Sequence, residues 1–314
     1  MTTLHNLIHN PQIFEPQLRA LYGSDTARHS ARLVEIARAF ELHFGPNEQV
    51  VVFSAPGRSE IGGNHTDHNR GKVLAAGVNL DIMGVVARLD EMRILEQSVG
   101  HARNEIDLSQ LEVVEAEKGG SAAMIRGICA GFVARGYNIG GFAAATHSEV
   151  LSGSGLSSSA AFEVFIATVL NELYNDGAIA PLEIAQICQR AENVYMGKPC
   201  GLLDQATCAV AGFVAIDFEN LQAPVVTKLD FDFEACGYAL CVVNTGGSHS
   251  DLTDDYAAVR GEMEAVARAL GCDVLRETTQ EALLADLARV RGVCGDRAVM
   301  RALHFFAENT RVDA

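Results

Sequence analysis

Several features that would place a chain in a familiar class are missing from this sequence of 314 residues. Its eight cysteines form no CxxC pair and no zinc-ligand spacing, and most lie among apolar residues, as small buried side chains do in a reducing compartment. The N-terminus lacks the basic region and apolar run of a secretory signal. No run approaches the roughly 18 apolar residues that a membrane span needs. We therefore expect a soluble, cytoplasmic protein.

Positive charge is also scarce. The chain has 24 lysines and arginines against 40 acidic residues, which gives a net charge of −16. Binding to nucleic acid or to an anionic membrane requires an excess of cations that neutralises phosphates, so we expect neither partner. A phosphorylated ligand would need a local source of positive potential, such as a helix N-terminus, a bound cation or a single well-placed arginine.

Apolar residues make up 48% of the chain, enough for a large core. The patterns predict helices over the first 47 residues and from about Leu252 onward, with strands and helices mixed irregularly between them. Because the strict alternation of a doubly wound sheet is missing, α+β is the favoured fold class. Strands are expected at 49–55, 73–79, 82–88, 92–97, 141–149, 213–218 and 238–244, and further helices at 122–135, 158–175, 181–195 and 298–306.

A serine-rich segment, LSGSGLSSSAA at 151–161, separates an expected strand from an expected helix. Its two glycines allow close approach of the backbone to a ligand, and the first amides of a helix point outward without internal partners. This combination suits nucleotide phosphates, although a serine-rich helix cap explains the segment about equally well. It is not a Walker A loop, because no Lys-Ser/Thr follows the glycines. It is not a dinucleotide fingerprint either, because Ser158 stands at the third glycine position.

A polar loop, APGRSEIGGNHTDHN at 55–69, follows the first expected strand. Asn64, His65 and Asp67 supply both donors and acceptors, as the vicinal hydroxyls of a sugar require. His65 and His68 form an HxxH pair, a weak indication of zinc without a third ligand nearby. A turn stabilised by Asn and Asp side chains is the alternative interpretation.

Two further polar segments carry little information by themselves. CQRAENVYMGKPCGLLDQ at 188–205 places Glu192 near a helix end and Asp204 after a Pro-Cys-Gly turn. Taken alone, a solvated glutamate and a helix cap explain both residues. VVNTGGSHSDLTDDYAAVR at 242–260 runs from an expected strand through a polar turn into a helix, where a residue such as Tyr256 usually packs.

Taken in this order, the four segments resemble those of the galactokinases, a branch of the GHMP small-molecule kinase superfamily. The serine segment is shared with the wider superfamily, whereas the HTDxN and CGLLDQ motifs indicate the galactokinase branch. The resemblance runs from about Leu33 to the last residue. The matching motifs are PGR at 56–58, GNHTDHN at 63–69, GSGLSSSA at 153–160, PCGLLDQ at 199–205, and Asn244, His249, Ser250, Tyr256 and Arg260.

The resemblance implies a two-domain kinase that binds ATP and a small sugar, most simply galactose, between its domains and phosphorylates the anomeric hydroxyl with the help of Mg²⁺. It implies that Asp204 is the base and that Arg58 stabilises charge on the transferring phosphoryl group. Ser159 and Glu192 would hold the magnesium ion. The sugar would be bound by Asn64, His65, Asp67, Gly201 and Tyr256, and the ATP phosphates by Gly153, Ser154, Gly155, Leu156, Ser157, Ser158 and Ser159.

The sequence departs from the family pattern at three points. Asn64 replaces the usual glutamate and His68 the usual tyrosine, and both positions concern sugar recognition. Galactokinases also continue further and carry a third glycine-rich motif, so the expected division is a helical segment at 1–47, an N-terminal domain at 48–200 and an incomplete C-terminal domain at 201–314. Two alternatives stay open: a kinase for a related sugar such as N-acetylgalactosamine or arabinose, and a non-catalytic sensor of galactose and ATP.

Overall fold

The computed structural model describes residues 2–47, 49–64, 66–151, 153–231, 233, 235–243 and 253–314, with the side chains of helix α8 described from Ala258 onward. These residues form two compact units, each built from separated stretches of chain. Unit 1 consists of Met1–Gly57, Val78–Ser152 and Leu156–Ala209, and unit 2 consists of Arg58–Gly77, Gly153–Gly155 and Val210–Ala314.

The N-terminal part of unit 1 is helical, as its sequence predicts. It contains α1 (Leu4–His9), the 3₁₀ turn η1 (Pro11–Phe14), α2 (Glu15–Tyr22) and α3 (Thr26–Phe44). α3 buries Leu33, Ile36, Ala37 and Phe40 along one face, which is the helical spacing seen in the sequence.

A mixed sheet forms the middle of unit 1. Its strands follow the order β4 (Asn104–Asp107), β3 (Arg93–Ser98), β5 (Phe142–Ser148) and β2 (Lys72–Arg88), and β1 (Val51–Gly62) also pairs with β2. β3 is parallel to β5, whereas β5 is antiparallel to β2. β1 and β2 are long enough to contribute residues to both units.

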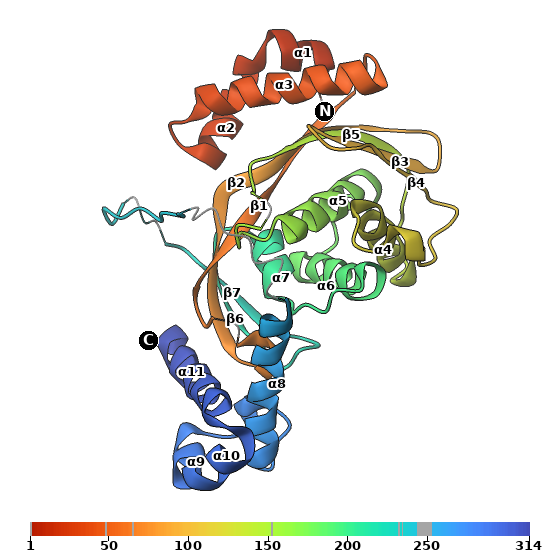
Figure 1. Ribbon diagram of the computed structural model, residues 1–314. Coiled ribbons are helices and arrows are strands. Elements are labelled where there is room, and N and C mark those ends of the chain that lie inside the picture. Colours follow the sequence, from red (N-terminus) through yellow and green to blue (C-terminus); the bar gives the residue numbers. More distant parts are fainter. Residues whose placement is uncertain are drawn as a thin grey trace. The chain divides into compact units, whose positions relative to one another are not determined.

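Helices cover both faces of this sheet (Figure 1). On one side Met83, Val85 and Ala87 of β2 pack with α1–α3. On the other, the intervening Ile82 and Val86 pack with α4 (Ser121–Ala134), α5 (Ser158–Tyr174) and α6 (Pro181–Ala191). The period of two along a strand thus gives β2 two apolar faces and unit 1 three layers.

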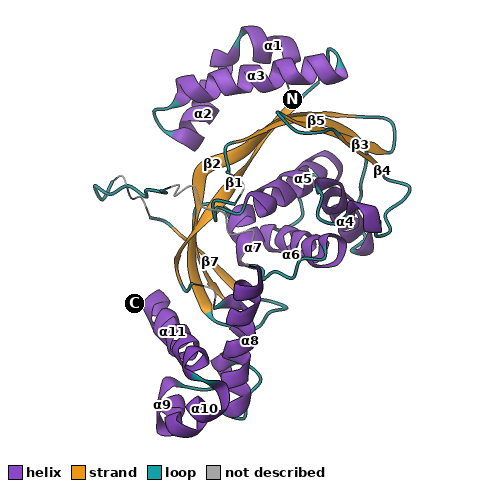
Figure 2. Cartoon of the chain, in the orientation of Figure 1, coloured by secondary structure: helices purple, strands orange, loops and turns teal. Residues whose placement is uncertain are grey.

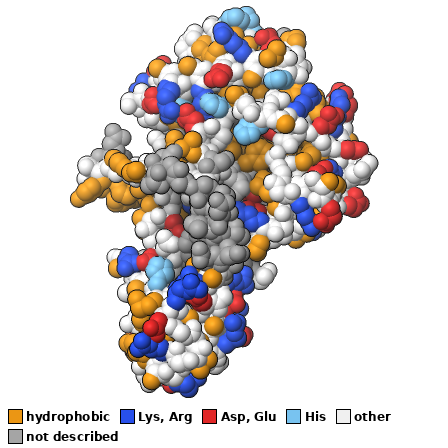
Figure 3. Space-filling model, viewed as in Figure 1, with side chains coloured by type: hydrophobic (Ala, Val, Ile, Leu, Met, Phe, Trp, Pro, Cys, Tyr) orange, Lys and Arg blue, Asp and Glu red, His pale blue; other side chains and the backbone are white. Residues whose placement is uncertain are grey.

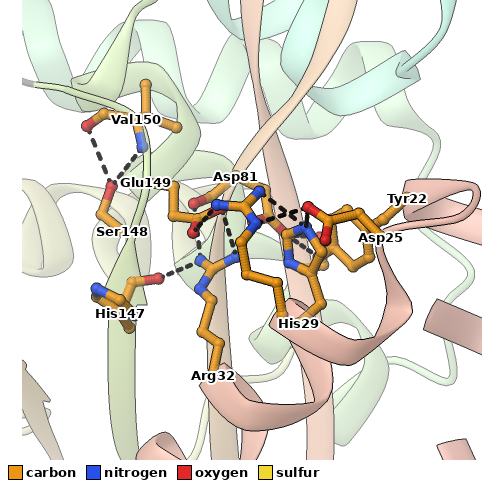
Figure 4. Close-up of polar contacts among 11 residues, drawn as sticks. Tyr22, Asp25, His29, Arg32, Asp81, His147, Ser148, Glu149 and Val150 are labelled. Atoms are coloured by element: carbon orange, nitrogen blue, oxygen red, sulfur yellow. Dashed lines mark hydrogen bonds and ion pairs between the residues drawn. The ribbon is translucent and has the colours of Figure 1, made fainter. Parts of the chain in front are cut away.

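A buried polar network joins the N-terminal helices to β2 (Figure 4). Asp81 is 2% exposed and Arg32 of α3 is 4% exposed. Arg32 Nη1 donates to Asp81 Oδ1 at 2.5 Å, and Arg32 Nη2 donates to the carbonyl of His147 at 2.6 Å. Tyr22 and Ser54 donate their hydroxyls to Asp81 Oδ2. Burial, together with the charge of Asp81, raises the pKa of Tyr22, which keeps its hydroxyl protonated as a donor.

Unit 2 combines a small sheet with a group of helices. The first residues of β2 pair with β6 (Phe213–Asp217), which pairs with β7 (Val225–Leu229), both antiparallel. α8 (Thr253–Ala269), the 3₁₀ turn η6 (Leu275–Glu277), α9 (Gln280–Ala285), α10 (Leu287–Cys294) and α11 (Asp296–Asp313) follow one another (Figure 2). They share a core that includes Val266, Leu275 and Phe305. Acidic and basic side chains lie side by side on the surface of this unit (Figure 3). Among the ion pairs of these helices, Glu262 pairs with Arg297 and Arg301.

The mixed architecture confirms the predicted α+β class, but several expected elements were wrong. The strands expected at 73–79 and 82–88 are one continuous strand, β2, because the partners of Asp81 allow a charged residue inside it. Residues 238–243 are irregular and exposed rather than a strand, and Asn244 lies outside the described residues. The helix expected at 181–195 is present: α6 covers Pro181–Ala191 and continues directly into a π-helical turn, Glu192–Met196. β4 and β7 were not predicted, because strands this short carry little periodicity. Within the described ranges, no helix is both long and apolar enough to cross a membrane.

Candidate active site

The serine loop, residues 153–159, connects β5 to α5 through an unusual backbone. Gly153, Gly155 and Ser157 have φ values of 72°, 79° and 57°. A left-handed conformation is uncommon for a residue with a side chain and costs on the order of 1–3 kcal/mol, so Ser157 marks a strained position. Ser158 and Ser159 then begin α5, whose first amides lack partners inside the helix. The loop therefore has the form of an anion-binding turn.

The strained serine contacts the residue expected to be the base. Ser157 Oγ donates to Asp204 Oδ2 at 2.6 Å. Asp204 lies in the first turn of α7 (Leu203–Val210), where the helix dipole favours a negative charge, and Gly201 lies just before this helix. Within unit 1 the structure thus joins the serine loop directly to the carboxylate.

A second carboxylate, Glu192, is buried and contacts Gln205, the residue after Asp204. Glu192 is 2% exposed and begins a π-helical turn, Glu192–Met196, a rare element that is often found at functional sites. Lys198 Nζ donates to Glu192 Oε1 at 3.0 Å, and Gln205 Nε2 donates to Glu192 Oε2 at 2.8 Å. Because Gln205 directly follows Asp204, one helix turn positions both carboxylates.

Glu163 completes this cluster, and sequence reasoning missed it. Gln205 Nε2 also contacts Glu163 Oε2 at 3.1 Å. Burial raises the pKa of Glu163 well above its ordinary value, and the nearby charge of Glu192 raises it further. The available signal was its spacing, since Glu163 lies four residues after Ser159 on α5, where side chains share a face.

The oxygen atoms of this cluster fit a hard cation. Glu163 Oε1 and Gln205 Oε1 are buried without a hydrogen-bond partner, and both side chains belong to the group around Glu192. In the part of the chain that the structure describes, no group of three or more His, Cys, Asp or Glu side chains could hold a metal ion by itself. Mg²⁺ usually takes one or two carboxylates and completes its shell with water and substrate phosphates. The residues present therefore fit an ion that arrives with a nucleotide.

Arg58, on β1, contacts the serine loop within unit 2. Its Nη1 donates to the carbonyl of Gly155 at 2.6 Å. The preceding Gly57 has no room for a side chain, because a Cβ there would lie 2.9 Å from the carbonyl oxygen of Leu156. The Pro-Gly-Arg motif is explained by these two contacts: the glycine lets the loop approach, and the arginine binds its backbone.

The 63–69 loop of unit 2 is a tight turn closed by one hydroxyl. Thr66 Oγ1 lies 2.9 Å from the carbonyl oxygen of Gly63 and 2.8 Å from that of Lys72. Gly63 has a φ of 80°, and a Cβ there would collide with Lys72. Asp67 is 7% exposed, and His68 Nδ1 lies 3.5 Å from its carboxylate. The loop is therefore rigid at both ends, with the aspartate held by its turn.

The predicted site residues fall into two sets, one in each unit. Ser157, Glu192 and Asp204 are linked in unit 1, and Arg58 is bound to Gly155 in unit 2. His65, Asn244, His249, Ser250 and the side chain of Tyr256 lie outside the described residues. The roles assigned to individual residues stay predictions.

Two family models match this chain. The model of the GHMP kinases N terminal domain covers residues 119–212, and the galactokinase galactose-binding signature covers residues 38–88. The first range contains the serine loop and both buried carboxylates, and the second contains Arg58 and the 63–69 loop.

Known proteins give a consistent result. The galactokinase of Streptomyces coelicolor is 33% identical over 267 residues, which cover 83% of this chain and 67% of the relative. Human galactokinase is 32% identical over 289 residues, which cover 89% of this chain and 70% of the relative. The chain thus spans about two thirds of the length of these relatives.

Solved structures share the fold. The crystal structure of Lactococcus lactis galactokinase complexed with galactose matches with a TM-score of 0.72 at 24% identity, over 90% of this chain and 73% of that one. Methanococcus jannaschii mevalonate kinase matches with a TM-score of 0.52 at 15% identity, over 78% of this chain and 81% of that one. With the sequence relatives, these matches lead to one conclusion: the chain belongs to the galactokinase family of the GHMP kinases.

Proposed function

We propose that this protein transfers the γ-phosphoryl group of ATP to the C1 hydroxyl of D-galactose. The observation that carries the proposal is the hydrogen bond from Ser157 to Asp204, because it joins a loop suited to phosphates to a carboxylate suited to accept a proton. Galactose is the sugar suggested by the matched signature and by the named relatives.

In the proposed reaction, Asp204 accepts the proton of the C1 hydroxyl while the sugar oxygen forms its bond to the γ-phosphorus. The bond between that phosphorus and the bridging oxygen breaks, and ADP leaves with the electron pair. Ser157 orients the carboxylate by donating to its Oδ2 at 2.6 Å. The amides at the start of α5 bind the nucleotide phosphates, and Arg58 fixes the loop at Gly155.

Ser159 and Glu192 are the residues that we propose hold Mg²⁺. The bound ion would neutralise charge on the nucleotide phosphates, which a chain of net charge −16 otherwise repels. Lys198 now occupies one oxygen of Glu192, but its side chain is exposed and can turn into solvent. The second oxygen stays fixed by Gln205 and keeps the carboxylate in place.

A coupled assay of ADP formation tests the proposal with galactose, N-acetylgalactosamine, arabinose and glucose as acceptors. We expect the highest kcat/KM with galactose and no turnover without Mg²⁺. A higher kcat/KM with another sugar would identify a kinase for that sugar. Binding of ATP and galactose without any turnover would indicate a non-catalytic sensor.

Asn64 offers a test of sugar selection, because an uncharged amide stands where galactokinases usually have glutamate. Hydrogen bonds to charged groups contribute roughly 1.5–3 kcal/mol against about 1 for neutral ones. Asn64→Glu should therefore lower the KM for galactose about threefold to tenfold and sharpen the preference for it. Asn64→Gln, which adds the same length without charge, is the matched control. An unchanged sugar profile or a raised KM in Asn64→Glu would assign selectivity to other residues.

A further inference from the structure

The last helix of unit 2 binds the backbone of the 63–69 loop. Glu308 Oε2 accepts the amide of Gly63 at 2.8 Å and that of Asn64 at 3.2 Å. His304 Nε2 donates to the carbonyl of Asn64 at 2.9 Å. Glu308 is only 7% exposed. α11 thus binds both backbone polar groups of Asn64, one of the two residues of this loop that depart from the family pattern.

The same helix also contacts Lys72, the first residue of β2, which follows the 63–69 loop. Asn309 Oδ1 accepts the amide of Lys72 at 2.8 Å, and Asp313 pairs with Lys72 Nζ at 2.6 Å. His304 and Glu308 are four residues apart, as are Asn309 and Asp313, so these groups form two neighbouring rows on α11. The helix therefore contacts the backbone where the 63–69 loop begins and again at Lys72, the first residue of β2.

A carboxylate suits this position for a physical reason. Two adjacent amides point at one oxygen, and bonds to a charged acceptor are roughly twice as strong as bonds to a neutral one. A buried amide left without a partner is destabilising, because its lost hydration is not replaced. The other oxygen of Glu308 is paired with Arg311, which helps to hold the side chain in place. The backbone at Gly63 and Asn64 is thus fixed by a group 245 residues away in sequence.

We propose that Glu308 is a positioning residue for sugar recognition, acting through the backbone of Gly63 and Asn64 on the side chains of the 63–69 loop. The inference rests on the proposed function, because that function assigns the loop to the sugar. Neither matched family range includes Glu308, since the ranges cover residues 38–88 and 119–212.

The test is a steady-state comparison of Glu308→Gln with the unchanged protein. We expect the KM for galactose to rise about tenfold, which corresponds to the loss of about 1.4 kcal/mol, while kcat and the KM for ATP stay within about twofold. A loss of sugar binding alone raises the KM for galactose and leaves kcat unchanged, whereas a general loosening of the fold would raise the KM values for both galactose and ATP. Glu262→Gln is the matched control, because Glu262 pairs with two arginines in the same unit. It should leave the KM for galactose unchanged.

Each outcome decides the proposal. An unchanged KM for galactose in Glu308→Gln, in a protein that phosphorylates galactose, would overturn this inference alone. A protein that neither binds nor phosphorylates any sugar of the panel would overturn the proposed function and this inference with it. Glu308→Asp keeps the charge on a side chain that is shorter by one methylene. Its KM for galactose should therefore lie between those of the original protein and Glu308→Gln. Should the Gln variant fail to fold, an Asp variant with the original KM would overturn the inference.

Discussion

Asp204→Asn is expected to lower kcat by about 10²- to 10⁴-fold, the range that a general base contributes. The amide has the size of the carboxylate, so it fills the same space, and its oxygen still accepts a hydrogen bond from the hydroxyl of Ser157. It cannot take the proton of the sugar hydroxyl, because a neutral amide is a very weak base. Calorimetric titration should find galactose and ATP binding within about threefold of the original values, since the change removes little ground-state contact.

Two comparisons make this result specific. Ser157→Ala removes the donor to Asp204 but keeps the carboxylate, so we expect a smaller loss of kcat than in Asp204→Asn. Asp217→Asn changes an aspartate that pairs with Arg276 in unit 2, and its kcat should be unchanged. Turnover of Asp204→Asn close to that of the original protein would show that another group is the base.

The largest stability effect is expected from the buried pair of Asp81 and Arg32. Arg32→Met removes the cation and leaves the Asp81 carboxylate buried, with the hydroxyls of Tyr22 and Ser54 as its remaining partners among the residues that the structure describes. Breaking such a pair from one side typically costs about 3–5 kcal/mol, because the remaining charge stays desolvated. Urea unfolding monitored by circular dichroism should therefore show a large decrease in the midpoint with little change in slope.

A double variant separates the pair from its surroundings. In Arg32→Met with Asp81→Leu, both charges are gone, and much of the lost free energy should return, since well-packed apolar residues replace buried ion pairs at little cost. The coupling free energy from this cycle measures the pair itself. Additive single and double effects would mean that Asp81 and Arg32 stabilise unit 1 independently of each other.

The predictable parts of this molecule are those governed by local pattern. α3 could be predicted because Leu33, Ile36 and Phe40 repeat at helical spacing, and the same spacing is buried in the structure. β2 was predicted as two strands, at 73–79 and 82–88, and Arg32, the residue that pairs with the buried Asp81 between them, is 49 positions away. The sequence around Asp81 does not indicate a partner that is so distant along the chain.

The site divides in the same way. The motifs named Ser157, Asp204 and Glu192, but not the left-handed backbone at Ser157 or its hydrogen bond to Asp204. Glu163 was not singled out from the sequence, because its contact with Gln205 depends on a helix that follows later in the chain. Motifs report which residue types a site uses, whereas tertiary packing decides which of them touch.

The contact between Gly63 and Glu308 also bears on the order in which the molecule becomes functional during synthesis. Domains fold as the chain emerges, at roughly 5–20 residues per second, so the 245 positions between these residues correspond to a delay of roughly 12 to 50 s. During this interval the amides of Gly63 and Asn64 have left the ribosome but their carboxylate has not. The serine loop and Asp204 lie only 47 positions apart and can join early. A nascent chain would therefore form the contact between the serine loop and Asp204 well before the backbone at Gly63 and Asn64 is bound by Glu308.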